Sequence, residues 1–222
     1  MTKTNYISEF HLFVLARPTT APDGGAGWEP QWIHGDMGCG LAVYCSALDA
    51  EIVRAQRIAQ GESGWRRMRL QDFPVLELVP VGTDQLICQM VYGFLLSGRN
   101  PRLVVSDGRI QPVYLPMTFK GLEGAIAPVT LDFVGDGGVF DGMRSDWTRI
   151  GAKSYPQQIT KINQEPGLRL ANLAHRALKA ASPVADDADS ATWGIFQPYL
   201  SAWSSGEIDA RWRGTVIRAE TG

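Results

Sequence analysis

Cys45 is the residue whose type and position come closest to those of a catalytic group. It ends the apolar segment 41–45 and directly precedes Ser46, where a helix is expected to begin. A thiol at a helix N-terminus has a lowered pKa, because the partial positive charge there favours the thiolate. His34 would be its candidate base and Asp36 the orienting acid. Cysteine is also often buried, and no pattern places His34 beside Cys45, so we assign no catalytic residue.

Patterns that would hold a metal or a cofactor are missing from the sequence. There is no G-x-x-x-x-G-K-[ST] loop for phosphates, no C-x-x-C pair and no H-E-x-x-H helix. The acids Asp132, Asp136 and Asp141 lack the alternating spacing of a calcium loop, and their neighbouring glycines indicate turns. The sequence therefore predicts neither a metal nor a cofactor.

Large aromatic side chains are the strongest indication of function. Near the end of the chain four of them fall within eleven residues, and two indoles flank Pro30. Tryptophan and tyrosine provide a large contact area at low entropic cost and dominate interface energies. We name six residues as candidates for a protein interface: Trp193, Phe196, Tyr199, Trp203, Trp28 and Trp32. The alternative is that these rings cover the core.

Arginines close to an aromatic ring suggest a second kind of partner. Three of them follow Trp65, and three more lie further along the chain: Arg66, Arg67, Arg69, Arg99, Arg102 and Arg109. A shared basic face with a stacking ring would bind single-stranded nucleic acid. The 21 basic residues are balanced by 23 acidic ones, so the overall charge disfavours nucleic acid and favours an ordinary solvated strand.

The first half of the chain reads as strands around one helix. Strand-forming residues predict strands over 10–17, 41–45, 65–70 and 85–96. The last of these is the most apolar run, and its β-branched and aromatic residues favour a long central strand. Ser46, with Asp49 three residues later, predicts the start of a helix that runs over 47–60.

The second half begins as an antiparallel meander and then becomes helical. Asp107-Gly108 lies between the extended runs 103–106 and 109–115, which is a typical hairpin sequence. After Pro166-Gly167, apolar residues at helical spacing predict a helix that ends near 181. Further strands are expected at 128–133 and 213–218.

Together these elements predict an α+β fold, a mainly antiparallel sheet packed by two or more helices. A chain of 222 residues suits one hydrophobic core, so we expect a single domain over 1–222. Loops rich in Gly and Pro or in polar residues are expected near 18–31, 135–142 and 182–192.

Composition indicates the compartment and the class of function. No apolar run has the length of a membrane span or a leader, and three cysteines without a framework spacing indicate reduced thiols, so we expect a cytoplasmic protein that does not enter a membrane. We predict a non-enzymatic protein-binding module with a protein partner, such as a toxin-neutralising immunity protein or an accessory of a secretion or assembly machine. The alternatives are a thiol-based hydrolase or transferase with a site assembled from distant segments, and a single-stranded nucleic-acid binder.

Overall fold

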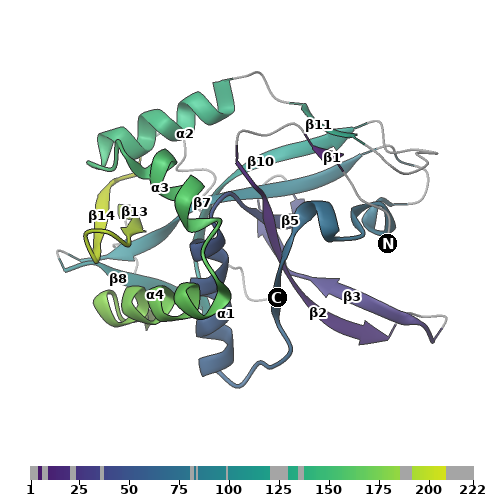
Figure 1. Cartoon of the computed structure of the whole chain (residues 1–222), viewed down its shortest axis with the longest axis horizontal. Coiled ribbons are helices and arrows are strands. Elements are labelled where there is room, and N and C mark those ends of the chain that lie inside the picture. Colours follow the sequence, from purple (N-terminus) through teal and green to yellow (C-terminus); the bar gives the residue numbers. More distant parts are fainter. Residues whose placement is uncertain are drawn as a thin grey trace.

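The computed structural model has the α+β fold that the sequence predicts, with helices packed against a mixed, mostly antiparallel open sheet (Figure 1). It describes residues 5–6, 10–20, 24–35, 38–80, 83, 85–98, 100–120, 130–134, 138–185 and 192–208. The strands are β1 (Asn5–Tyr6), β2 (Phe13–Thr20), β3 (Ala26–Pro30), β4 (Trp32–Gly35), β5 (Gly38–Tyr44), β6 (Arg66–Arg69), β7 (Leu86–Ser97), β8 (Arg102–Ser106), β9 (Arg109–Ile110), β10 (Pro112–Lys120), β11 (Thr130–Val134), β12 (Val184–Ala185), β13 (Thr192–Gln197) and β14 (Ala202–Glu207). The helices are α1 (Ala47–Ala59), α2 (Gly138–Arg149), α3 (Tyr155–Ile162) and α4 (Gly167–Ala180), with short 3-10 turns η1 (Leu70–Asp72) and η2 (Val75–Leu78).

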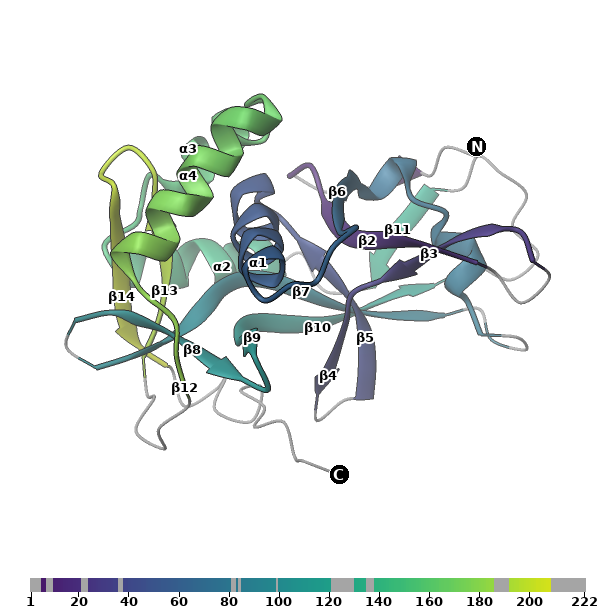
Figure 2. The ribbon, with the colours of Figure 1, turned by 90° about the horizontal axis from the view of Figure 1, so that it is seen from below.

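The long apolar strand β7 is the centre of the sheet, as its composition predicts. β10 pairs with it antiparallel on one side and β5 pairs with it parallel on the other. Near its C-terminal end β7 also pairs with β8 and β13. The path of the sheet runs from β1 through β11, β10, β7, β5 and β2 to β3, so β2 and β3 end it as a ribbon that extends away from the helices (Figures 1 and 2).

Alternating side chains divide the interior into two cores, one on each face of the sheet. On β5, Leu41 and Val43 belong to one cluster, while Ala42 and Tyr44 belong to the other. The first cluster, here the α2–α3 core, contains buried residues from α2, α3 and the link between them: Met143, Trp147, Ile150, Tyr155 and Ile159. The second, the α1–α4 core, contains buried residues from α1 and α4: Leu48, Ile52, Val53, Leu170, Ala174 and Ala177. The position of each helix follows from the face that it covers.

Two helices have the ends that the sequence indicates. Ser46 caps α1 with extended backbone angles, and its hydroxyl accepts a hydrogen bond from the Asp49 amide at 3.4 Å. The helix closes at Gln60, and Gly61 follows with a positive φ of 88°. α4 begins directly after Pro166, which has no amide hydrogen to leave unpaired at a helix start. α1 and α4 pack against each other (Figure 1).

The predicted loop at 18–31 is wrong, because most of it forms the β2–β3 ribbon. Thr20 pairs with Ala26 and Pro18 with Trp28. Beyond Ala16, β6 no longer pairs with β2, so Pro18 stands where the strand has one neighbour. A proline is tolerated at such a position because its missing donor can face the open side.

The predicted loop at 135–142 is also wrong over 138–142, which form the first turns of α2. Glycine and aspartate suggested turns, but burial of Met143 and Trp147 along one side of the helix outweighs these local preferences. The predicted loop at 182–192 contains β12, which pairs parallel with β8, and ends at Thr192, the first residue of β13. Residues 135–137 and 186–191 lie outside the described residues, as does the strand expected at 213–218.

No helix within the described segments is long and apolar enough to cross a membrane. This finding agrees with the sequence, in which no apolar run reaches the length of a span.

Gly93 on β7 gives room for the Trp193 ring of β13. A Cβ atom at this position would lie 2.6 Å from Trp193 Cε3 and 3.0 Å from the Gly194 carbonyl oxygen. The register of β10 against β7 shifts at this same point. The close approach of β13 to β7 therefore requires glycine at position 93.

We predict that Gly93→Ala lowers the free energy of unfolding by about 1–3 kcal/mol, because the added methyl group overpacks the core against Trp193. The matched control is Gly142→Ala in α2, where a Cβ atom meets nothing within 4 Å. That change should stabilise the protein by up to about 1 kcal/mol through helix propensity. Urea unfolding followed by circular dichroism measures both, and a Gly93→Ala variant as stable as the wild type would contradict this packing.

Candidate functional site

Half-buried apolar side chains from β3, β4, β6 and the η2 segment pack on the face of the sheet that carries the α2–α3 core. Trp28 lies on β3, and Trp32 on β4 is paired with Leu41 of that core. All of the partly buried side chains in this group pack against the α2–α3 core: Trp28, Trp32, Met68, Leu76, Leu78 and Val79. We call this set the indole face. Two of the six predicted interface residues, Trp28 and Trp32, belong to it.

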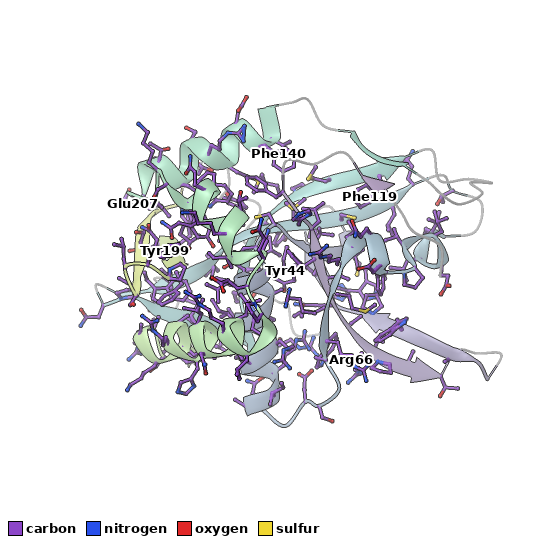
Figure 3. All side chains as sticks on the ribbon, in the orientation of Figure 1. Tyr44, Arg66, Phe119, Phe140, Tyr199 and Glu207 are labelled. Carbon is purple, nitrogen blue, oxygen red and sulfur yellow. The ribbon has the colours of Figure 1, made fainter. Side chains whose placement is uncertain are left out.

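An arginine fixes the position of the first indole. The guanidinium carbon of Arg66 lies 5.8 Å from the centre of the Trp28 ring, a cation–π distance. Arg66 is exposed and shares its strand face with Met68, two residues further along β6. Figure 3 shows the Arg66 side chain at the ribbon end of the molecule.

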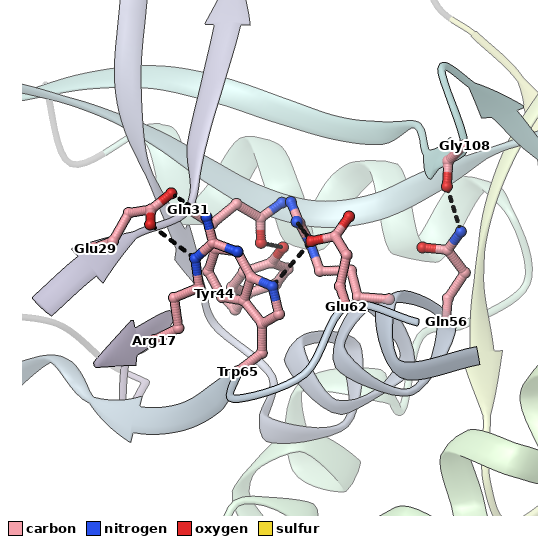
Figure 4. Close-up of polar contacts among 9 residues, drawn as sticks. Arg17, Glu29, Gln31, Tyr44, Gln56, Glu62, Trp65 and Gly108 are labelled. Atoms are coloured by element: carbon pink, nitrogen blue, oxygen red, sulfur yellow. Dashed lines mark hydrogen bonds and ion pairs between the residues drawn. The ribbon is translucent and has the colours of Figure 1, made fainter. Parts of the chain in front are cut away.

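The opposite face of the ribbon carries a polar network around Trp65 (Figure 4). The ring of Trp65 has the guanidinium carbon of Arg57 at 4.3 Å and that of Arg17 at 5.3 Å from its centre. Its indole N–H donates to Glu62 at 2.9 Å, and Arg57 pairs with the same carboxylate at 2.7 Å. Trp65 is 5% exposed, so it offers no open ring to a nucleic-acid base.

The acids of this network are held in their charged form. Hydrogen bonds from Arg17 lower the pKa of Glu29, against a smaller effect of desolvation. Desolvation raises the pKa of Glu62, but hydrogen bonds from Arg57 and Trp65 and the charge of Arg57 together lower it. The network therefore fastens β3 and the loop after α1 to the sheet.

The aromatic residues near the end of the chain are mostly buried. Trp193 is 2% exposed and Phe196 is fully buried, so neither ring is available at the surface. Trp203 is half-buried, and its indole N–H donates to the Ala177 carbonyl of α4 at 3.1 Å. Tyr199 is 56% exposed, at the turn between β13 and β14 and on the opposite side of the molecule from Arg66 (Figure 3). Of these four candidates, Tyr199 is exposed and Trp203 is half-buried, whereas Trp193 and Phe196 are core residues.

Cys45 is fully buried, and its thiol contacts the Val91 carbonyl at 3.6 Å. Burial raises its pKa well above the usual value, and the nearby Asp49 raises it further, so the helix terminus does not produce a thiolate. The thiol beside His34 is instead Cys39, its cross-strand partner, with Sγ 3.9 Å from Nε2. Cys45 lies six residues beyond Cys39, about 20 Å along an extended chain. The structure does not bring Cys45 and His34 together, and Asp36 lies outside the described residues.

Cys39 does not become an activated nucleophile by this contact. Partial desolvation raises the pKa of Cys39, so the thiol form is favoured. Recognising residues 32–35 and 38–41 as a hairpin would have placed Cys39 beside His34. The other histidines are both exposed and far apart in the chain, His11 just before β2 and His175 on α4.

The six arginines do not form one strip. Arg66 lies on the indole face, and Arg67 and Arg69 lie on the opposite face of the same strand, because neighbouring residues of a strand alternate. Arg102 and Arg109 belong to β8 and β9, and Arg99 lies outside the described residues. In the described segments no group of three or more His, Cys, Asp or Glu side chains could hold a metal ion.

A buried polar cluster that sequence reasoning missed joins α1 to α3. The Tyr155 hydroxyl donates to the Asp49 carboxyl group, 3.3 Å from each oxygen. Asn163 accepts a hydrogen bond from the Ala47 amide at 2.7 Å and donates to the Cys45 carbonyl at 3.1 Å. Desolvation raises the pKa of Asp49 to about 7, although the hydrogen bond from Tyr155 opposes this shift. Asp49 and Tyr155 are both fully buried, so the cluster stabilises the fold and has no access to a substrate.

Comparison with known proteins shows no relative: no protein-family model, no curated protein and no solved structure matches the chain.

We predict that Asp49→Asn changes how stability depends on pH. The pKa of Asp49 is about 7 in the folded state and about 3.9 in the unfolded chain, so folding favours the neutral carboxyl group. The stability that this preference contributes is fully present below pH 4 and is lost as pH rises through 7. As the pH rises from 4 to 8, the unfolding free energy of the variant should therefore rise relative to that of the wild type, by on the order of 2–4 kcal/mol. Urea unfolding at several pH values measures the difference.

The control for this prediction is Asp72→Asn, at an exposed aspartate of η1, which should follow the wild type throughout. A stability difference between Asp49→Asn and the wild type that does not change with pH would show that Asp49 stays ionised inside the fold.

Proposed function

We propose that this protein is a cytosolic, non-enzymatic protein-binding module and that its partner docks on the indole face. A toxin-neutralising immunity protein and an accessory of a secretion or assembly machine both fit this description. The observation that carries the proposal is that two half-buried indoles, Trp28 and Trp32, pack against the same core, with the exposed Arg66 over the Trp28 ring.

The composition of the indole face is that of an interface hot spot. Tryptophan and arginine contribute most to binding when they lie in a patch that a partner can dehydrate. Methionine and leucine, here Met68, Leu76 and Leu78, add adaptable apolar contact around them. Each of these side chains is already partly packed, so a partner would complete its burial at little further cost in side-chain entropy.

The geometry favours docking by side chains over addition of a strand. β3 is the outer strand of the ribbon, and an open edge can in principle recruit an extended peptide. Its last two residues are Glu29, which pairs with Arg17 at 2.7 Å, and Pro30, which has no amide to donate. A charge and a proline on an edge strand both discourage strand pairing.

The thiol-enzyme alternative has less support. It needs an accessible, ionisable Cys45 close to a base, whereas Cys45 is fully buried beside the carboxyl group of Asp49. The nucleic-acid alternative needs a free stacking ring near the arginines, whereas Trp65 already lies between Arg17 and Arg57.

We predict that Trp28→Ala, Trp32→Ala and Arg66→Glu each weaken the complex tenfold or more, because each removes or repels a contact at the centre of the interface. The tagged protein first captures its partner from a native lysate, and mass spectrometry identifies it. Titration calorimetry with the purified partner then compares the variants. Arg66 is exposed, so Arg66→Glu tests the surface without removing core contacts.

Two variants serve as controls. Leu168→Ala removes a side chain that is 79% exposed on α4, away from the ribbon, and should bind as the wild type does. Tyr199→Ala tests the other accessible aromatic candidate. If Tyr199→Ala weakens the complex while Arg66→Glu and both tryptophan variants do not, the partner binds at the β13–β14 turn and the indole face is not the interface.

A further inference from the structure

Arg67 and Arg69 project from β6 on the face opposite Arg66. Their cross-strand partners on β2 are Leu15 and Phe13, which belong to the α1–α4 core. The guanidinium carbon of Arg67 lies 5.2 Å from the centre of the Phe13 ring, which holds this side chain in place. The two arginines are therefore neighbours on one strand face, about 7 Å apart at their Cα atoms.

α1 adds a third arginine, whose charge is already paired. Arg54 donates to the two oxygens of Glu51 at 2.5 and 2.9 Å. The Glu51 side chain is 5% exposed, so its carboxylate is largely dehydrated, and both of its oxygens are bound by the Arg54 guanidinium group. Glu51 is consequently committed to Arg54 and cannot neutralise a second guanidinium with the same geometry.

Arg67 and Arg69 lack such a partner. Within the segments that the structure describes, neither side chain forms an ion pair. The Nε atom of Arg67 is buried and has no hydrogen-bond partner there. A buried donor left unpaired costs stability until something accepts its hydrogen bond.

The pKa of Arg67 agrees with the lack of a paired counter-charge in the described part of the chain. Desolvation lowers the pKa of Arg67, and the positive charges of Arg54 and Arg69 lower it further, while Glu51 raises it. Because Glu51 is already paired with Arg54, the charges of Arg67 and Arg69 have no paired counter-charge among the described residues. An anion bound at these guanidinium groups would relieve the repulsion between them.

We propose that Arg67 and Arg69, with Arg54 beside them, form a binding site for a phosphate-class dianion. A phosphate monoester carries a charge of about −1.5 to −2 at pH 7 and offers three strong acceptor oxygens, which matches two adjacent guanidinium forks. A single carboxylate would leave one of the two charges unbalanced. The site lies on the opposite face of the sheet from the indole face and does not depend on the proposed partner.

The test is thermal unfolding of the whole chain titrated with inorganic phosphate at pH 7.5 and constant ionic strength. We expect a saturable rise in the melting temperature, because a ligand that binds only the folded state stabilises it. Arg69→Gln changes an exposed side chain, and Arg67→Met keeps the apolar stem over Phe13. Each should weaken phosphate binding at least tenfold, whereas Arg102→Gln, at an exposed arginine of β8, should bind within twofold of the wild type.

A fourth variant produces the opposite change. Glu51→Gln frees Arg54 from its counter-charge, so phosphate should bind at least threefold more tightly. A phosphoserine peptide that binds tenfold more tightly than inorganic phosphate would assign the group to a phosphorylated partner, and equal affinity would assign it to a small phosphate ester. The proposal is overturned if binding does not saturate, or if Arg69→Gln and Arg67→Met bind phosphate as the wild type does.

Discussion

Burial of β7 on both faces is the constraint on which the rest of the structure depends. A strand that is covered on both sides must find apolar partners above and below, and the helices supply them in pairs: α2 with α3 on one face, and α1 with α4 on the other. The requirement holds even at Gln89, which is fully buried although its amide has no hydrogen-bond partner among the described residues. The ribbon of β2 and β3 extends beyond this double cover, and for that reason Trp28 on β3 stays half-buried.

Local signals in the sequence were sufficient for the elements that local physics determines. The β-branched and aromatic run of β7, the Ser46 cap of α1 and the helical spacing after Pro166 all appear in the structure as expected. α2 was missed because its glycines and aspartates favour turns, and only tertiary burial of Trp147 and its neighbours overrides them. The β2–β3 ribbon was missed for a similar reason, since Pro18 is compatible with a strand only once β6 has ended.

The sequence identified candidate interface residues by their type, but it could not show which of these side chains would be exposed. Trp28 and Trp32 were named from the sequence and lie half-buried on one face, whereas Trp193 and Phe196 looked equally suitable and are core residues. The difference comes from a distant position, since Gly93 on β7 makes the space that Trp193 fills. The three arginines of β6 illustrate the same limit. They are close in sequence, yet strand alternation sends Arg66 to one face and Arg67 and Arg69 to the other, where the charge of Arg54 of α1 acts on Arg67.

We propose that a protein partner covers the indole face and leaves the opposite end of the molecule free. Hydroxyl-radical footprinting of the free protein and of its complex, read by mass spectrometry, tests this claim most directly. We expect Trp28 and Trp32 to be oxidised in the free protein and protected in the complex, with Tyr199 reactive in both and the buried Trp147 reactive in neither. Protection of Tyr199 with unchanged oxidation of Trp28 and Trp32 would contradict the account.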